Sequence, residues 1–104
     1  MRIGIFGGSF NPPHLGHRRL ADEMIETAAL DKMLIIPAGT PPHKSTDELV
    51  GGEHRFEMCK LAFSGDKYIV SDIEYQRQGK SYTVDTVSEI RKIYPDDELF
   101  LIIG

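Results

Sequence analysis

Cysteine, positive charge and long hydrophobic runs are scarce in this sequence, and each scarcity excludes a class of protein. Cys59 is the only cysteine, so no internal disulfide can form, which favours a reducing cytoplasm over a secreted scaffold. The formal net charge is −4, which argues against nucleic-acid binding through a basic face. The N-terminus lacks the hydrophobic core of a signal peptide, and no apolar run approaches membrane-spanning length.

Repeats, low-complexity stretches and linkers are absent as well, so the 104 residues predict one small domain. Within it, short apolar segments alternate with segments of helical spacing. The predicted strands cover residues 2–6, 32–36, 68–71 and 99–103, and the predicted helices cover residues 18–29, 53–64 and 84–94. This order predicts an α/β, Rossmann-like fold with a parallel sheet, right-handed crossovers and helices on both faces.

The segment between the first predicted strand and helix contains residue types that bind phosphate. Residues 7–17 read Gly-Gly-Ser-Phe-Asn-Pro-Pro-His-Leu-Gly-His, with neither a Walker A lysine nor a G-x-G-x-x-G pattern. Gly7 and Gly8 lack a Cβ, so their N–H groups can approach an anion and their φ can be positive. Ser9 adds a hydroxyl donor. A strand–helix joint of this kind lies where ligands of α/β sheets bind.

Two histidines end this segment. His14 and His17 are three residues apart, so they share one face if the helix has begun. The free N–H groups and positive dipole end of a helix start favour an anion, to which imidazoles can donate. A structural role or half of a metal site are the alternatives, but zinc needs about three or four ligands. Phosphate binding is therefore the preferred interpretation.

Two later segments extend this interpretation. Pro-Pro-His-Lys, residues 41–44, follows the second predicted strand and opens on the same sheet edge; Lys44 suits a phosphate, although a solvated turn is the plainer interpretation. Ser-Tyr-Thr-Val-Asp-Thr, residues 81–86, begins the third predicted helix. It offers an aromatic ring and free N–H groups, with an ordinary N-cap at Thr83 and a core tyrosine as the alternative.

These three segments together resemble the nucleotidyltransferase superfamily marked by His-x-Gly-His and, within it, the bacterial nicotinate-nucleotide adenylyltransferase family. The similarity runs along nearly the whole chain, and residues 7–17 carry its most specific signature. It implies adenylyl transfer from ATP to nicotinate mononucleotide in NAD biosynthesis, giving deamido-NAD and pyrophosphate. Mg²⁺ is implied too, bound mainly through the ATP phosphates, with no protein ligand to the metal.

The resemblance also implies roles for individual residues. His14 and His17 are the implied catalytic residues, which contact the ATP phosphates and stabilise the transition state. The implied ATP- and phosphate-binding residues are Gly7, Gly8, Ser9, Phe10, His14, His17 and Lys44. The implied nicotinate mononucleotide-binding residues are His43, Lys44, Tyr82 and Thr83. Many relatives have Thr at Ser9 and Asp at Asn11; the first difference keeps the hydroxyl and the second removes a charge.

The family is usually nearly twice as long, and its second signature, Ser-x-Thr-x-x-Arg, is not found in this chain. Residues 1–104 are therefore expected to form the N-terminal, nucleotide-binding part of a single nucleotidyltransferase domain, with weak nucleotide binding and doubtful activity in isolation. Another enzyme of the superfamily, such as phosphopantetheine adenylyltransferase or a cytidylyltransferase, and a non-catalytic nucleotide-binding module are the alternatives. A homo-oligomer is compatible with the sequence, whereas nucleic-acid and membrane partners are not expected.

Three other residue groups have plainer interpretations. His54 and Arg55 are expected on the surface of the second predicted helix. Cys59 is expected to be a small buried hydrophobic residue. The acidic run over residues 96–98 is expected to form a solvated turn.

Overall fold

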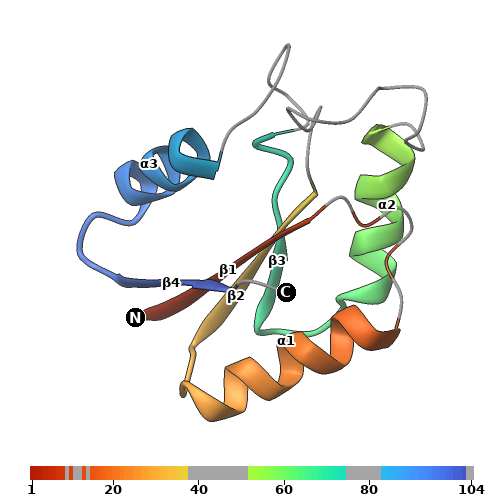
Figure 1. Ribbon diagram of the computed structural model, residues 1–104, viewed down its shortest axis with the longest axis horizontal. Helices are drawn as coiled ribbons and strands as arrows, with labels where there is room; N and C mark the ends of the chain where they lie inside the picture. The colour runs from red at the N-terminus through yellow and green to blue at the C-terminus, as the bar shows by residue number, and fades with distance from the viewer. Residues whose placement is uncertain (9, 11–12, 14, 38–51, 75–82, 103–104) are drawn as a thin grey trace.

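The computed structural model describes residues 1–8, 10, 13, 15–37, 52–74 and 83–102 (Figure 1). Strands and helices alternate along them in the order β1 (Arg2–Gly8), α1 (Leu15–Thr27), β2 (Lys32–Pro37), α2 (Gly52–Ala62), β3 (Tyr68–Val70), α3 (Thr83–Ile93) and β4 (Glu98–Ile102). Every predicted strand and helix is confirmed, with boundaries shifted by up to three residues. None of the described helices has both the length and the apolar content needed to cross a membrane.

The four strands form one parallel sheet in the order β3-β2-β1-β4. β1 is a central strand that pairs with β2 on one side and with β4 on the other. Its last residue, Gly8, is the register partner of Pro37, the last residue of β2. Because parallel strands end at the same sheet edge, the carboxyl ends of β1 and β2 lie next to each other.

Alternating side chains of the strands build a separate core on each face of the sheet. On one face, α1 and α2 cover a cluster that comprises Phe6, Phe10, Ala21, Leu30, Met33, Ile35, Cys59, Phe63 and Ile102. On the other face, α3 covers a cluster that comprises Ile3, Ile5, Leu34, Ile36 and Ile90. Figure 1 shows α3 on the opposite side of the strands from α1 and α2. The predicted two-sided covering of a parallel sheet is confirmed.

The acidic run before β4 corrects one expectation in part. Asp96 is exposed in a turn, as expected. Asp97, however, lies 2.6 Å from the N-terminal amine of Met1, and Glu98 lies 2.9 Å from Nη1 of Arg2. The hydrogen bond to Asp97 raises the pKa of the Met1 amine. Two of these acids are therefore ion-paired rather than free in solvent, because the pairing of β4 with β1 brings them to the start of the chain.

Gly4 allows the core under α1 to close onto β1. A Cβ added at Gly4 would lie 2.8 Å from Cδ1 of Leu30 and 2.8 Å from Sδ of Met33. Both of these side chains are buried, so neither can move away into solvent. The glycine is required here by close packing and not by its backbone angles.

Gly4→Ala should therefore lower the free energy of unfolding by about 1–3 kcal/mol, the usual cost of overpacking a core. The measurement is urea denaturation of the 104-residue chain. Gly7→Ala is the matched control on the same strand, because the nearest atom to its added Cβ, the carbonyl oxygen of Ile36, is 3.8 Å away. Equal losses in the two variants would contradict the packing argument.

Candidate functional site

The glycine pair predicted to bind phosphate lies at the carboxyl end of β1. Gly7 is exposed and Gly8 is partly buried. Neither has a positive φ, so the left-handed backbone that glycine would allow is not adopted at these two positions. A Cβ on Gly8 would instead lie 3.4 Å from Cζ of Phe10. Gly8 thus lies within van der Waals range of the phenylalanine two residues later, while the Gly7 backbone is exposed at the sheet edge.

Phe10 carries the left-handed backbone of this joint. Its φ is +44° and its side chain is only 2% exposed. A bulky residue in this region is strained by about 1–3 kcal/mol, which the surrounding structure must offset. The ring lies edge-on to Phe6 at 5.3 Å and to Phe63 at 5.7 Å between centroids. Because the ring belongs to the core, the implied contact of Phe10 with ATP or phosphate is restricted to its backbone.

His17 lies in the first turn of α1, which begins at Leu15, earlier than predicted. Its imidazole is partly buried, and its centroid lies 5.0 Å from that of Phe10 at an interplanar angle of 79°. The Phe6 ring is further away, at 6.3 Å and 67°. His17 thus lies on the rim of the core and not within it. The positive dipole end of α1 lies beside it, which is an arrangement suited to an anion.

Several predicted site residues lie outside the described part of the chain, namely Ser9, His14, His43, Lys44 and Tyr82. Thr83 is the first residue of α3, but the structure describes only its backbone and not its side chain. The roles implied for these residues stay predictions. What the structure does place is the sheet edge from which two of the segments follow, at Gly8 and Pro37.

A hydrogen bond that the sequence did not predict fixes the first turn of α3. Thr86 is 3% exposed, and its hydroxyl donates to Oε2 of Glu74 at 2.6 Å. Glu74 follows β3, so the bond ties the carboxyl end of that strand to the beginning of α3. The second threonine of Ser-Tyr-Thr-x-x-Thr is the sequence signal for this contact, but no spacing rule identifies Glu74 as its partner.

Thr86→Val should lower the free energy of unfolding by about 1.5–3 kcal/mol, because the Glu74 carboxylate loses a donor inside the fold. Thr86→Ser is the matched control, since it keeps the hydroxyl and should recover most of that loss. Thermal unfolding of both variants measures the difference. Equal stability of the valine and serine variants would show that the hydrogen bond contributes nothing.

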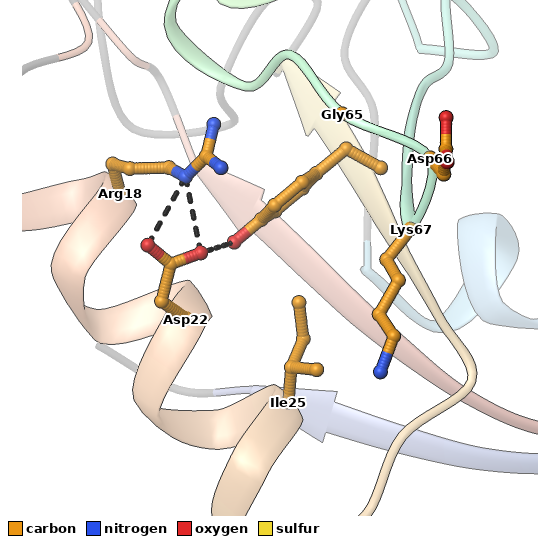
Figure 2. A pocket seen from close by; sticks show the side chains of 7 residues that line it. Arg18, Asp22, Ile25, Gly65, Asp66 and Lys67 are labelled. Carbon is orange, nitrogen blue, oxygen red and sulfur yellow. Dashed lines mark hydrogen bonds and ion pairs between the residues drawn. The ribbon is translucent and has the colours of Figure 1, made fainter.

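A charged cluster of Arg18, Asp22 and Tyr68 joins α1 to the start of β3 and borders a cavity of about 380 Å³ (Figure 2). Nε of Arg18 lies 3.0 and 3.2 Å from the two carboxylate oxygens of Asp22. The Arg18 guanidinium stacks on the Tyr68 ring at 4.4 Å, and the Tyr68 hydroxyl donates to Asp22. Burial, and then the hydrogen bond to Asp22, raises the pKa of Tyr68.

The same arginine also holds the end of α2. Nη1 of Arg18 donates to the carbonyl oxygens of Ala62 at 3.1 Å and Ser64 at 2.9 Å. These carbonyls belong to the last turn of α2 and the residues after it, where backbone acceptors have no helical partner. The cluster therefore connects α1 to the carboxyl end of α2. In the sequence, only the i, i+4 spacing of Arg18 and Asp22 signals it.

The start of α2 gives one correction and one confirmation. His54 is exposed, as expected, but Arg55 is 3% exposed, so its predicted surface position is wrong. Burial lowers the pKa of the Arg55 guanidinium. One turn later Cys59 is fully buried, as predicted, and burial raises the pKa of its thiol to about 11.

Cys59 should consequently resist alkylation by iodoacetamide in the folded chain at pH 8. The thiolate is the reacting form, and a folded pKa of about 11 against an ordinary value of 9.0 means that folding lowers the thiolate fraction at this pH. In urea, where the raised pKa is lost, we expect rapid modification. Mass spectrometry over time measures both rates. Equal rates in the folded and unfolded chain would contradict the burial of this side chain.

Comparison with known proteins agrees with the fold. A model of the cytidylyltransferase-like family matches residues 5–104. A probable nicotinate-nucleotide adenylyltransferase of Shouchella clausii is 49% identical over 104 residues, covering 99% of this chain and 54% of that protein. The nicotinate-nucleotide adenylyltransferase of Bacillus subtilis is 46% identical over 104 residues, covering 99% of this chain and 55% of that protein. The chain thus spans about half the length of the curated relatives it matches.

A solved structure has the same fold. The structure of Plasmodium falciparum nicotinic acid mononucleotide adenylyltransferase complexed with NaAD matches with a TM-score of 0.80 and 20% sequence identity. The match covers 99% of this chain and 51% of that one. At this identity the likeness establishes the fold and nothing more, and it agrees with the α/β, Rossmann-like fold predicted from the sequence.

Proposed function

The chain belongs to the cytidylyltransferase-like family, and we propose that it forms the ATP-binding part of a nicotinate-nucleotide adenylyltransferase. The reaction proposed is transfer of the adenylyl group of ATP to nicotinate mononucleotide, giving deamido-NAD and pyrophosphate. The observation that carries this proposal is the identity of 46–49% along 99% of the chain with relatives that bear this name. The His-Leu-Gly-His segment at the start of α1 supports it chemically.

The proposed phosphate site is the open end of β1 and the first turn of α1. Gly7 presents exposed backbone there, and His17 lies in the first turn of α1, at the positive end of the helix dipole. Developing negative charge on the transferred phosphorus and on the leaving pyrophosphate would be stabilised by these donors. His14, three residues before His17, is proposed to act with it, and Ser9 to add a hydroxyl donor.

The step itself needs little covalent chemistry from the protein. A phosphate oxygen of nicotinate mononucleotide attacks the α-phosphorus of ATP and forms the new P–O bond. The bond from the α-phosphorus to the bridging oxygen breaks, and pyrophosphate leaves with the electron pair. A phosphate is already largely ionised near neutral pH, so no general base is required. Positioning and charge neutralisation are what the site has to supply.

The second nucleotide is proposed to bind through segments that follow β2 and precede α3. His43 and Lys44 would contact its phosphate, and Tyr82 and Thr83 would contact the nicotinate ring and its carboxylate. The register of Gly8 with Pro37 supports the first part, because the chain leaves β1 and β2 at adjoining points. The N–H groups at the start of α3 support the second, because they are suited to a carboxylate.

ATP is proposed to enter as its Mg²⁺ complex. Among the residues that the structure describes, no group of three or more His, Cys, Asp or Glu side chains is placed to hold a metal ion. The ligands of this metal are proposed to be mainly phosphate oxygens and water. The protein contributes donors to the same phosphates.

His17→Ala should lower the kcat of the protein that carries this chain by about 100-fold or more, as loss of one preorganised donor does in other enzymes. His54→Ala is the matched control, because His54 is exposed on α2 and has no role in the proposed site. The assay is pyrophosphate release from MgATP, with nicotinate mononucleotide, nicotinamide mononucleotide and phosphopantetheine as alternative acceptors. Near-normal turnover of the His17 variant would remove this histidine from the mechanism. Release with phosphopantetheine alone would overturn the proposed substrate.

A further inference from the structure

We propose that Phe10 is a positioning residue, whose buried ring fixes the orientation of the His17 imidazole at the phosphate-binding end of α1. The inference rests on the proposed function, in which His17 donates to the phosphates of ATP. The side chain of Phe10 is 2% exposed, so we assign it a role in orienting His17 and not in contacting the ligand.

The backbone at Phe10 shows that the fold maintains this ring position against a conformational preference. Its φ of +44° lies in the left-handed region that bulky residues avoid. The residue has no polar side chain that could form a local hydrogen bond to offset the strain. Strained residues persist where the surrounding structure over-determines them, and they are concentrated at functional sites. The left-handed backbone is thus found at a residue whose ring is buried in the core.

Gly8, two residues before Phe10, lies next to the same ring. A Cβ on Gly8 would lie 3.4, 3.5 and 3.7 Å from three atoms of the Phe10 ring. The ring is therefore folded back beneath the last residue of β1. This places it between that strand and the first turn of α1, where His17 lies.

The contacts of the ring point to His17. The centroids of Phe10 and His17 are 5.0 Å apart and nearly perpendicular, at 79°. This is a shorter separation than those from Phe10 to Phe6, 5.3 Å, and to Phe63, 5.7 Å. Edge-to-face packing of this kind favours one relative orientation of two rings. Among the aromatic contacts of the described residues, Phe10 thus gives the imidazole its closest partner.

Phe63 provides a matched comparison within the same cluster. It is also 2% exposed, and its ring contacts are with Phe6, Phe10 and Tyr68. Within the part of the chain that the structure describes, it makes no ring contact with His17. A substitution at Phe63 therefore changes the packing of the core without removing a ring contact of His17. A substitution at Phe10 changes the packing of the core and also removes a ring contact of His17.

The orientation of a donor matters because transition-state stabilisation depends on groups that are already aimed at the developing charge. A misplacement of about 1 Å can cost about 100-fold in rate. If Phe10 holds the imidazole, its loss should reduce kcat more than it reduces the binding of substrate. A residue that only stabilises the fold would not produce this division.

The test compares Phe10→Leu with Phe63→Leu, each of which replaces a buried ring by an aliphatic side chain. We expect both variants to lose similar thermal stability. Phe10→Leu should lower the kcat of adenylyl transfer by about tenfold, with less than about a twofold change in KM for nicotinate mononucleotide. Phe63→Leu should change kcat by less than about twofold. Phe10→Met, with a flexible apolar side chain, is the second variant if the leucine chain fails to fold.

A second readout needs no catalysis. The three-bond NMR couplings of His17 report its χ1 angle in the 104-residue chain without nucleotide. We expect a single rotamer in the parent chain and in Phe63→Leu, and averaging between rotamers in Phe10→Leu. Unchanged couplings and kcat in Phe10→Leu, or equal losses of kcat in the two leucine variants, would overturn the proposal. Absence of adenylyl transfer in the parent protein would instead overturn the proposed function, while the couplings would still decide the positioning role.

Discussion

Parallel pairing of β1 with strands on both sides is the constraint on which the rest of this structure depends. A strand paired on both sides directs its carboxyl end to the same edge as its neighbours, so Gly8 and Pro37 lie side by side. The segments that contain the phosphate-binding candidates follow these two residues. Segments that follow residues 29 positions apart in the sequence, Gly8 and Pro37, therefore begin from one short stretch of sheet edge.

The two faces of the sheet differ in their packing. The face under α1 and α2 contains most of the aromatic packing, with Phe6, Phe10 and Phe63 in mutual edge-on contact. Arg18 connects the two helices by binding Asp22 and the carbonyl oxygens that follow α2. Because His17 is the residue before Arg18, the same helical turn that presents the imidazole is anchored to a second helix.

The opposite face is held by α3, whose first turn is tied to the end of β3. The hydrogen bond from Thr86 to Glu74 is buried on the threonine side and involves a charged acceptor, which makes it stronger than a neutral one. The start of α3 is in this way fixed relative to the sheet, and this is the condition for helix N–H groups to select one ligand shape.

Local patterns in the sequence determined the order of strands and helices and the parallel sheet, because buried strands and amphipathic helices leave a periodic signal. They could not reveal the left-handed backbone at Phe10, since a bulky residue adopts it only when distant packing imposes it. Nor could they reveal the burial of Arg55 or the pairing of Thr86 with Glu74 and of Asp97 with the N-terminal amine. Those contacts join residues from separate elements, and only the packing of the sheet and its helices brings them together.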